Sequence, residues 1–246
     1  MQNTRYIMLS IAIVMMTGAF AQTTAVKPFD KIIVSPHIQV TYVEGNEESV
    51  SIESCTVDTG KIHIEVENKT LRLYLEGAKD IEKNEKDYHN GYKEKHSIYQ
   101  GTVVKAIITY KTLRTLSIRG DEKQLCKSAI TGDAFTLRIY GESDVTLNEI
   151  NVGALAATTY GECNLRFLSG SAASQTYTAY GEGNINSLSI GGKSSAITAY
   201  GEADFKMNVS DEIKIVAFGE AKVYYQGNPV IRKGLHIGEL HVEKMN

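Results

Sequence analysis

The most regular feature of the chain is an alternation of hydrophobic and polar positions in its C-terminal half. Small or apolar residues occupy every second position before an aromatic residue, in the pairs Leu137/Ile139, Ala157/Thr159, Tyr177/Ala179, Ile197/Ala199 and Ile215/Ala217. A period of two is typical of β-strands whose alternate side chains face a core. We therefore predict strands with these residues inward and the intervening positions outward.

The alternation is organised into a sequence repeat. An aromatic residue followed by Gly and Glu recurs with spacings of 20, 20, 20 and 18 residues, at Tyr140-Gly141-Glu142, Tyr160-Gly161-Glu162, Tyr180-Gly181-Glu182, Tyr200-Gly201-Glu202 and Phe218-Gly219-Glu220. A degenerate earlier copy is Ile118-Arg119-Gly120-Asp121-Glu122. The period is shorter than the roughly 34 residues of helical-hairpin repeats or the roughly 40 of propeller blades. It favours an all-β solenoid with coils of about 20 residues and Gly at the corners.

The N-terminal half has less regular strand patterns. Five short alternating or apolar segments are separated by turn residues: 32–34, 38–43, 50–52, 62–66 and 71–75. We expect this N-terminal β region, 22–78, to cap the solenoid of 102–246 or to continue it, in which case 22–246 is one domain. Residues 79–101 are rich in both charge signs and are expected to form a solvated loop.

The first residues indicate export. Arg5 precedes an apolar run from Ile7 to Met16, and the run is followed by Ala19-Phe20-Ala21. This is the pattern of a secretory signal peptide, here 1–21 with cleavage after Ala21. The run is shorter than the roughly 20 residues of a spanning helix, so no membrane span is expected after cleavage. We expect the protein in the periplasm or at the cell surface, associated with the outer membrane.

Composition narrows the classes of partner. The chain has 26 Lys and Arg against 29 Asp and Glu, a net charge of -3, and no basic stripe, which argues against nucleic acid. Its three cysteines, Cys55, Cys126 and Cys163, cannot form a closed disulfide framework. A disulfide between Cys55 and Cys126 and buried free thiols are both compatible with the sequence.

Two ladders are the candidate ligand-binding residues. If the coils stack in register, an outward aromatic column and an acidic column run side by side, comprising Tyr140, Tyr160, Tyr180 and Tyr200, and Glu142, Glu162, Glu182 and Glu202. Sugar rings pack on aromatic faces and sugar hydroxyls bond to carboxylates, so a glycan is the expected ligand. The alternative is structural, because stacked like residues also stabilise neighbouring coils. Repulsion between carboxylates could be relieved by exposure, by raised pKa values, by hydrogen bonds or by Ca²⁺.

The remaining motifs give weaker indications of a binding or catalytic site. Arg119-Gly120-Asp121 spells a receptor-binding tripeptide, yet it coincides with the degenerate first repeat. The six histidines have no metal-ligand spacing, and no metal site is predicted from them. The acids are spread evenly over the coils, and neither a nucleophile elbow nor a Cys/His pair is present. We therefore predict a non-catalytic protein without a cofactor, Ca²⁺ being the one alternative, and its expected partner is a glycan or an envelope protein. A polysaccharide-degrading enzyme is the less favoured alternative, because its acid or base pair would stand at one special coil and no coil stands out.

The pattern resembles the head GIN domain, or putative auto-transporter adhesin domain, family of bacterial exported proteins. The resemblance covers most of the mature chain and is carried by the opening segment 29–34, the segment 110–120, the glycine corners and the closing Tyr225-Gln226-Gly227-Asn228-Pro229. It implies a right-handed parallel β-helix in the cell envelope. The corners depart from the family, where Ser-Gly-Ser/Ala-Gly is usual and Tyr-Gly-Glu stands here.

Overall fold

The computed structural model describes residues 22–80, 84–89 and 92–245. The described residues contain no α-helix; they form fifteen strands and one turn of 3-10 helix at Thr59–Lys61. The strands are β1 (Gln22–Ala25), β2 (Lys31–Val34), β3 (Ile38–Glu44), β4 (Ser49–Cys55), β5 (Ile62–Glu67), β6 (Thr70–Leu75), β7 (Asn84–His89), β8 (Tyr92–Ser97), β9 (Val104–Tyr110), β10 (Thr115–Arg119), β11 (Gln124–Tyr140), β12 (Asp144–Tyr160), β13 (Cys163–Phe167), β14 (Gly170–Gln226) and β15 (Val230–Lys244).

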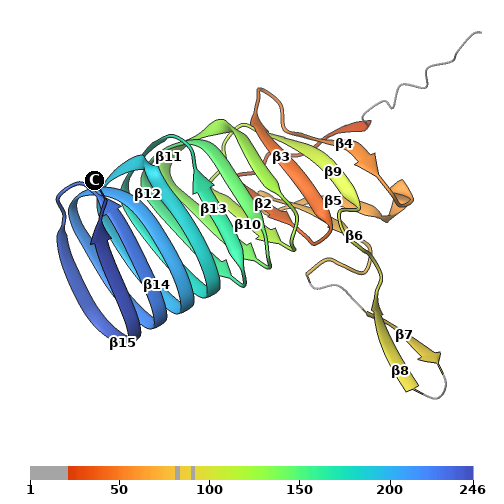
Figure 1. The fold of residues 1–246 in the computed structure, drawn as a ribbon. Helices are drawn as coiled ribbons and strands as arrows, with labels where there is room; N and C mark the ends of the chain where they lie inside the picture. Colours follow the sequence, from red (N-terminus) through yellow and green to blue (C-terminus); the bar gives the residue numbers. More distant parts are fainter. Residues whose placement is uncertain (1–21, 81–83, 90–91, 246) are drawn as a thin grey trace, which may run out of the picture.

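The C-terminal half is a stack of coils, which confirms the predicted β-solenoid (Figure 1). Strands β10 to β15 pair in parallel, and each long strand bends around corners of its coil. The register places equivalent repeat positions opposite one another, with Tyr140 beside Tyr160 and Tyr160 beside Tyr180. A repeat of constant length produces this register, because a coil of about 20 residues returns the chain to the same point one strand spacing along the axis.

The N-terminal strands both continue the solenoid and close its end. Strand β2 pairs in parallel with β10 and β6, and β3 pairs in parallel with β11 and β9. Antiparallel strands then cover the outer edges, β5 on β6 and β4 on β9, with β1 on β4. One sheet therefore joins the two halves of the chain. At the N-terminal end of the solenoid, the edges of this sheet are covered by the antiparallel strands β4 and β5.

The charged segment expected as a loop contains an antiparallel hairpin of β7 and β8, which projects from the side of the solenoid (Figure 1). The sequence carried a hairpin signal in the dipeptide Asn90-Gly91, which favours tight turns between strands. The high charge of the segment predicts solvent exposure, which a strand satisfies as well as a loop does.

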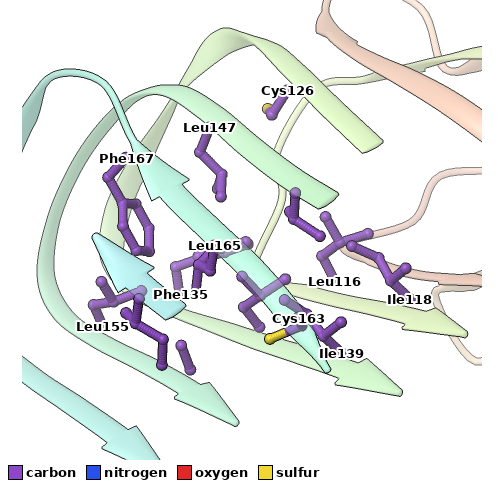
Figure 2. Packing of buried hydrophobic residues seen from close by; sticks show 14 of the residues in the cluster. Leu116, Ile118, Cys126, Phe135, Ile139, Leu147, Leu155, Cys163, Leu165 and Phe167 are labelled. Atoms are coloured by element: carbon purple, nitrogen blue, oxygen red, sulfur yellow. The ribbon is translucent and has the colours of Figure 1, made fainter. Parts of the chain in front are cut away.

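The core runs continuously along the solenoid axis. The alternating residues predicted to face inward, such as Leu137, Ile139, Ile197 and Ile215, are at most 2% exposed. Figure 2 shows side chains from successive coils, including Phe135, Leu155 and Phe167, meeting in the interior. Each coil by itself leaves one side of this apolar ladder uncovered, so the coils are stable only as a stack.

The three cysteines are free thiols, and the disulfide left open by the sequence is not formed. Cys126 and Cys163 are buried, whereas Cys55 is partly exposed. Burial raises the pKa of the Cys126 thiol to about 11, and it also raises the pKa of Cys163. Both buried thiols are therefore held in their neutral, unreactive form at neutral pH.

We expect a thiol reagent at pH 8 to modify Cys55 first and the two buried cysteines only on unfolding. With a pKa of about 11, roughly one Cys126 in a thousand is a thiolate at that pH. Because the folded-state pKa lies above the unfolded value, this group's contribution to stability is present below about pH 9 and is lost as the pH rises toward about 11. Rapid native labelling of all three thiols would contradict the burial described here.

Candidate functional site

The candidate site is built around a column of corner glycines. Gly120, Gly141, Gly161, Gly181, Gly201, Gly219 and Gly238 all have positive φ, between 104° and 124°. From Gly141 onward, a Cβ at each corner would lie 2.2–3.0 Å from the carbonyl oxygen of the preceding corner glycine. Both the backbone conformation and the close approach of the next coil therefore require Gly. The sharp corner separates the aromatic residue before it from the Glu after it.

Before each corner lies the predicted aromatic column. The rings of Tyr140, Tyr160, Tyr180, Tyr200 and Phe218 stack on one another with centroids 4.7–5.1 Å apart and planes 2–4° from parallel. Tyr160, Tyr180 and Tyr200 are 37–40% exposed, as expected for outward positions. The column is thus outward and in register, as the repeat indicated.

The ring faces of this column are covered. Each inner ring has a neighbour on both sides, and the Arg119 guanidinium lies 5.8 Å from the centroid of Tyr140 at one end. At the other end Ile237 is in register with Phe218. The exposed part of each tyrosine is therefore its edge and its hydroxyl rather than its face. A ligand would meet a row of hydroxyls, which differs from the flat aromatic platform that sugar packing requires.

After each corner the acidic column lines a long open groove of about 470 Å³. Its walls are formed by the exposed glutamates and by the polar column two residues further on: Glu142, Glu162, Glu182, Glu202, Glu220, Asn164, Asn184, Asp204 and Lys222, with Cys163, Gly183 and Ala203 at the base. The structure therefore brings all four predicted glutamates together. It leaves the tyrosines outside this groove, on the other side of the glycine corner.

The groove is strongly acidic. Its lining carries six carboxylates and one amine, and within the described residues none of the five glutamates forms an ion pair. Solvent exposure and salt relieve the repulsion between them. Among the same described residues, no group of three or more His, Cys, Asp or Glu side chains is placed to hold a metal ion. Ca²⁺, one of the four ways in which the repulsion could be relieved, thus has no coordinating cluster in the described part of the chain.

The Arg119-Gly120-Asp121 tripeptide is engaged within the protein. The Arg119 guanidinium pairs with the Asp80 carboxylate, and Asp121 Oδ1 accepts a hydrogen bond from the Glu142 backbone N–H at 2.9 Å. Its residues hold the first corner and the end of the aromatic column. These intramolecular contacts support the interpretation of the tripeptide as the degenerate first repeat rather than as a receptor-binding motif.

The structure contains one further copy of the repeat, which the aromatic-Gly-Glu pattern in the sequence did not identify. Ile237, Gly238 and Glu239 pair in register with Phe218, Gly219 and Glu220. Gly238 has the same positive φ, 109°, as the other corners. The dipeptide Gly238-Glu239 could have indicated this copy, but Ile237 stands before it in place of the aromatic residue. The acidic column accordingly extends to the last coil.

Comparisons with known proteins agree with this architecture. Residues 28–229 match the family described as "Putative auto-transporter adhesin, head GIN domain". A crystal structure of a putative adhesin from Bacteroides fragilis is similar with a TM-score of 0.77 and 19% identity, over 92% of this chain and 96% of that chain. None of the curated proteins matches this chain.

Two further solved structures have the same fold. A putative adhesin from Parabacteroides merdae has a TM-score of 0.65 at 16% identity, covering 92% of this chain and 95% of that chain. A putative lipid binding protein from Parabacteroides distasonis has a TM-score of 0.64 at 15% identity, covering 92% and 96%. At these identities the likeness establishes the fold alone. The family match covers most of the sequence, and the chain therefore belongs to the putative auto-transporter adhesin, head GIN domain family.

Proposed function

We propose that the protein is an exported, non-catalytic, adhesin-like protein of the bacterial cell envelope that binds glycan in the acidic groove, along the glutamate column that runs beside the tyrosine column. The observation that carries the proposal is the groove of about 470 Å³ lined by glutamates of successive coils. Family membership and the signal-peptide pattern of residues 1–21, which lie outside the described residues, support the adhesin role and export. No helix among the described residues is long and apolar enough to cross a membrane.

The groove offers hydrogen-bonding groups suited to sugar hydroxyls. Carboxylates accept hydrogen bonds, and the amides of Asn164 and Asn184 both donate and accept them. These groups recur in successive coils, about 4.8 Å apart along the axis, so they suit an extended polymer. The excess of carboxylates favours neutral or amine-bearing glycans over acidic ones, because like charges repel.

The even distribution of the acids argues for binding rather than catalysis. Glycoside hydrolysis uses one acid and one base, or one acid and one nucleophile, at a single scissile bond. Here Glu142, Glu162, Glu182 and Glu202 stand at the same place in four successive coils. A surface that repeats in this way contacts many sugar units equally and singles out no bond for cleavage.

We expect a triple variant, Glu162→Gln/Glu182→Gln/Glu202→Gln, to bind neutral or amine-bearing glycans at least about tenfold more weakly than the wild type, because charge-assisted hydrogen bonds are lost. A glycan array followed by titration calorimetry would measure this. Glu47→Gln/Glu53→Gln, which changes exposed glutamates of the N-terminal half, is the matched control and should bind normally. Unchanged affinity in the triple variant would remove the groove from the proposal.

A second candidate function is that of a structural or assembly protein with protein partners. The covered ring faces favour it, since the aromatic column then serves to hold the coils. The last coil also favours it, because Val230, Leu235 and Ile237 are 60–64% exposed there. A Tyr160→Ser/Tyr180→Ser variant separates the two functions. If the wild type binds glycan and the variant, although still folded, does not, the tyrosine column takes part in binding. If the wild type binds no glycan and the variant only melts at a lower temperature, assembly is supported.

A further inference from the structure

A second pocket, of about 370 Å³, lies where the N-terminal strands join the regular coils. It is lined by the first residue of β2, the segment leading into β10 and the bend of β11: Lys31, Thr112, Arg114, Thr115, Thr131, Gly132, Asp133, Ala134 and Thr136. Strands β2, β10 and β11 are neighbours in the sheet, with Lys31 in register with Thr115 and Thr115 in register with Thr136 (Figure 1). Its volume is within the range of about 300–1,000 Å³ of small-molecule sites.

The pocket presents unpaired positive charge. Lys31 and Arg114 are exposed, and within the described part of the chain neither forms an ion pair. The backbone that carries Arg114 is fixed: its N–H donates to the Asp30 carbonyl oxygen at 2.8 Å, and its carbonyl accepts from the Thr136 N–H at 2.9 Å. Asp133 is the single carboxylate of the lining. The two cations therefore outnumber it.

Four threonines line the same pocket as these cations. The lining includes Thr112, Thr115, Thr131 and Thr136, and none of their hydroxyls has a hydrogen-bond partner among the described residues. A hydroxyl both donates and accepts, so four of them can bond either to an oxyanion or to the hydroxyls of a sugar. A guanidinium adds a fork of N–H donors that matches carboxylate and phosphate geometry.

The arrangement is particular to this coil. In the next coil Ala156 takes the register position of Thr136, and Gly153 lies over the Asp133 backbone. The cations come from segments that precede the regular repeat, so the later coils have no equivalent of Lys31 or Arg114. The pocket differs in this respect from the acidic groove, which repeats from coil to coil and has the opposite charge.

We propose that this pocket is a second binding site, which takes the oxyanion group of an acidic sugar, with Lys31 and Arg114 holding the anion and the threonines holding the ring hydroxyls. A sugar carboxylate, a sugar phosphate and a sugar sulfate all present such a negatively charged oxyanion. The site is independent of the acidic groove, which repels such ligands. An anionic glycan unit and a neutral glycan chain would therefore bind at different places on the molecule.

Titration calorimetry with glucuronate, glucose 6-phosphate, inorganic phosphate and uncharged glucose tests the proposal. We expect the two acidic sugars to bind more tightly than either inorganic phosphate or glucose. Arg114→Gln and Lys31→Gln should each weaken the acidic sugars by about tenfold or more. Arg114→Lys, which keeps the charge without the fork, should give a smaller loss. No binding of either acidic sugar, or inorganic phosphate binding as tightly as the sugars, would overturn the site as proposed.

Two controls make the result specific. Lys193→Gln removes an exposed cation three repeat lengths after Asp133 and should leave the acidic sugars bound as in the wild type. The groove variant Glu162→Gln/Glu182→Gln/Glu202→Gln should also bind them normally, so failure of the groove proposal and failure of this one are distinguishable. Equal weakening in Lys193→Gln would show general charge attraction and would overturn the pocket.

Discussion

Replacing Gly219 with Ala is expected to lower the free energy of unfolding by about 2–6 kcal/mol. The φ of Gly219 is 124°, a conformation that residues with a Cβ rarely adopt. The new Cβ would also lie 2.3 Å from the carbonyl oxygen of Gly201 in the preceding coil. Because that neighbour is backbone, the clash can be relieved only by moving one coil relative to the next, which disturbs the inward ladder as well.

Thermal and denaturant unfolding of Gly219→Ala would measure this effect, as a fall in melting temperature of roughly 5–20 °C for a protein of this size. Gly191→Ala is the matched control. It lies on the same long strand β14, has no positive φ and would have no atom within 4 Å of its Cβ. We expect it to change stability by no more than about 1 kcal/mol. Equal stability of the two variants would mean that the corners are not as tightly stacked as described.

Phe167→Ala should cost about 3–5 kcal/mol of stability, because it removes a fully buried ring from the middle of the solenoid. Phe167 is 2% exposed and packs with core residues of neighbouring coils (Figure 2). A repeat fold cannot close such a cavity easily, since the backbone on each side is held by the register of two other coils.

The next residue provides an internal control for this core prediction. Leu168 is 52% exposed, so Leu168→Ala should change stability by less than about 1 kcal/mol. Denaturant titration of the two single variants measures the difference directly. Similar losses for both would contradict the placement of Phe167 inside and Leu168 outside.

Each glycine corner positions both the tyrosine column and the glutamate column, so corner stability and groove binding are linked. The glycine corner sends the tyrosine to one face and the glutamate into the groove on the other. A variant that moves the corner should therefore disturb groove binding together with stability. Groove variants such as Glu162→Gln should weaken binding with at most a small effect on stability, since these carboxylates are exposed and lack ion pairs among the described residues.

The glutamate column of the acidic groove was predictable from the sequence, whereas the covered ring faces of the tyrosine column and the cationic pocket were not. The 20-residue period indicated that Glu142, Glu162, Glu182 and Glu202 would form a column, because a constant coil length returns each to the same position. The period could not show that the ring faces of the tyrosine column cover one another, since that depends on side-chain rotamers across coils. The cationic pocket was missed because its residues are distant in the sequence and lie outside the repeat.

The sequence by itself determined the strand alternation, the inward face, the coil length and the need for Gly at each corner, because these follow from local backbone geometry and a fixed repeat. Only the tertiary structure decided the order in which distant strands pair. It joined β2 to β10 and β3 to β11, and it closed one end of the solenoid with reversed strands. Such pairings depend on contacts between remote segments, which periodicity does not encode. The pocket of Lys31 and Arg114 exists for the same reason.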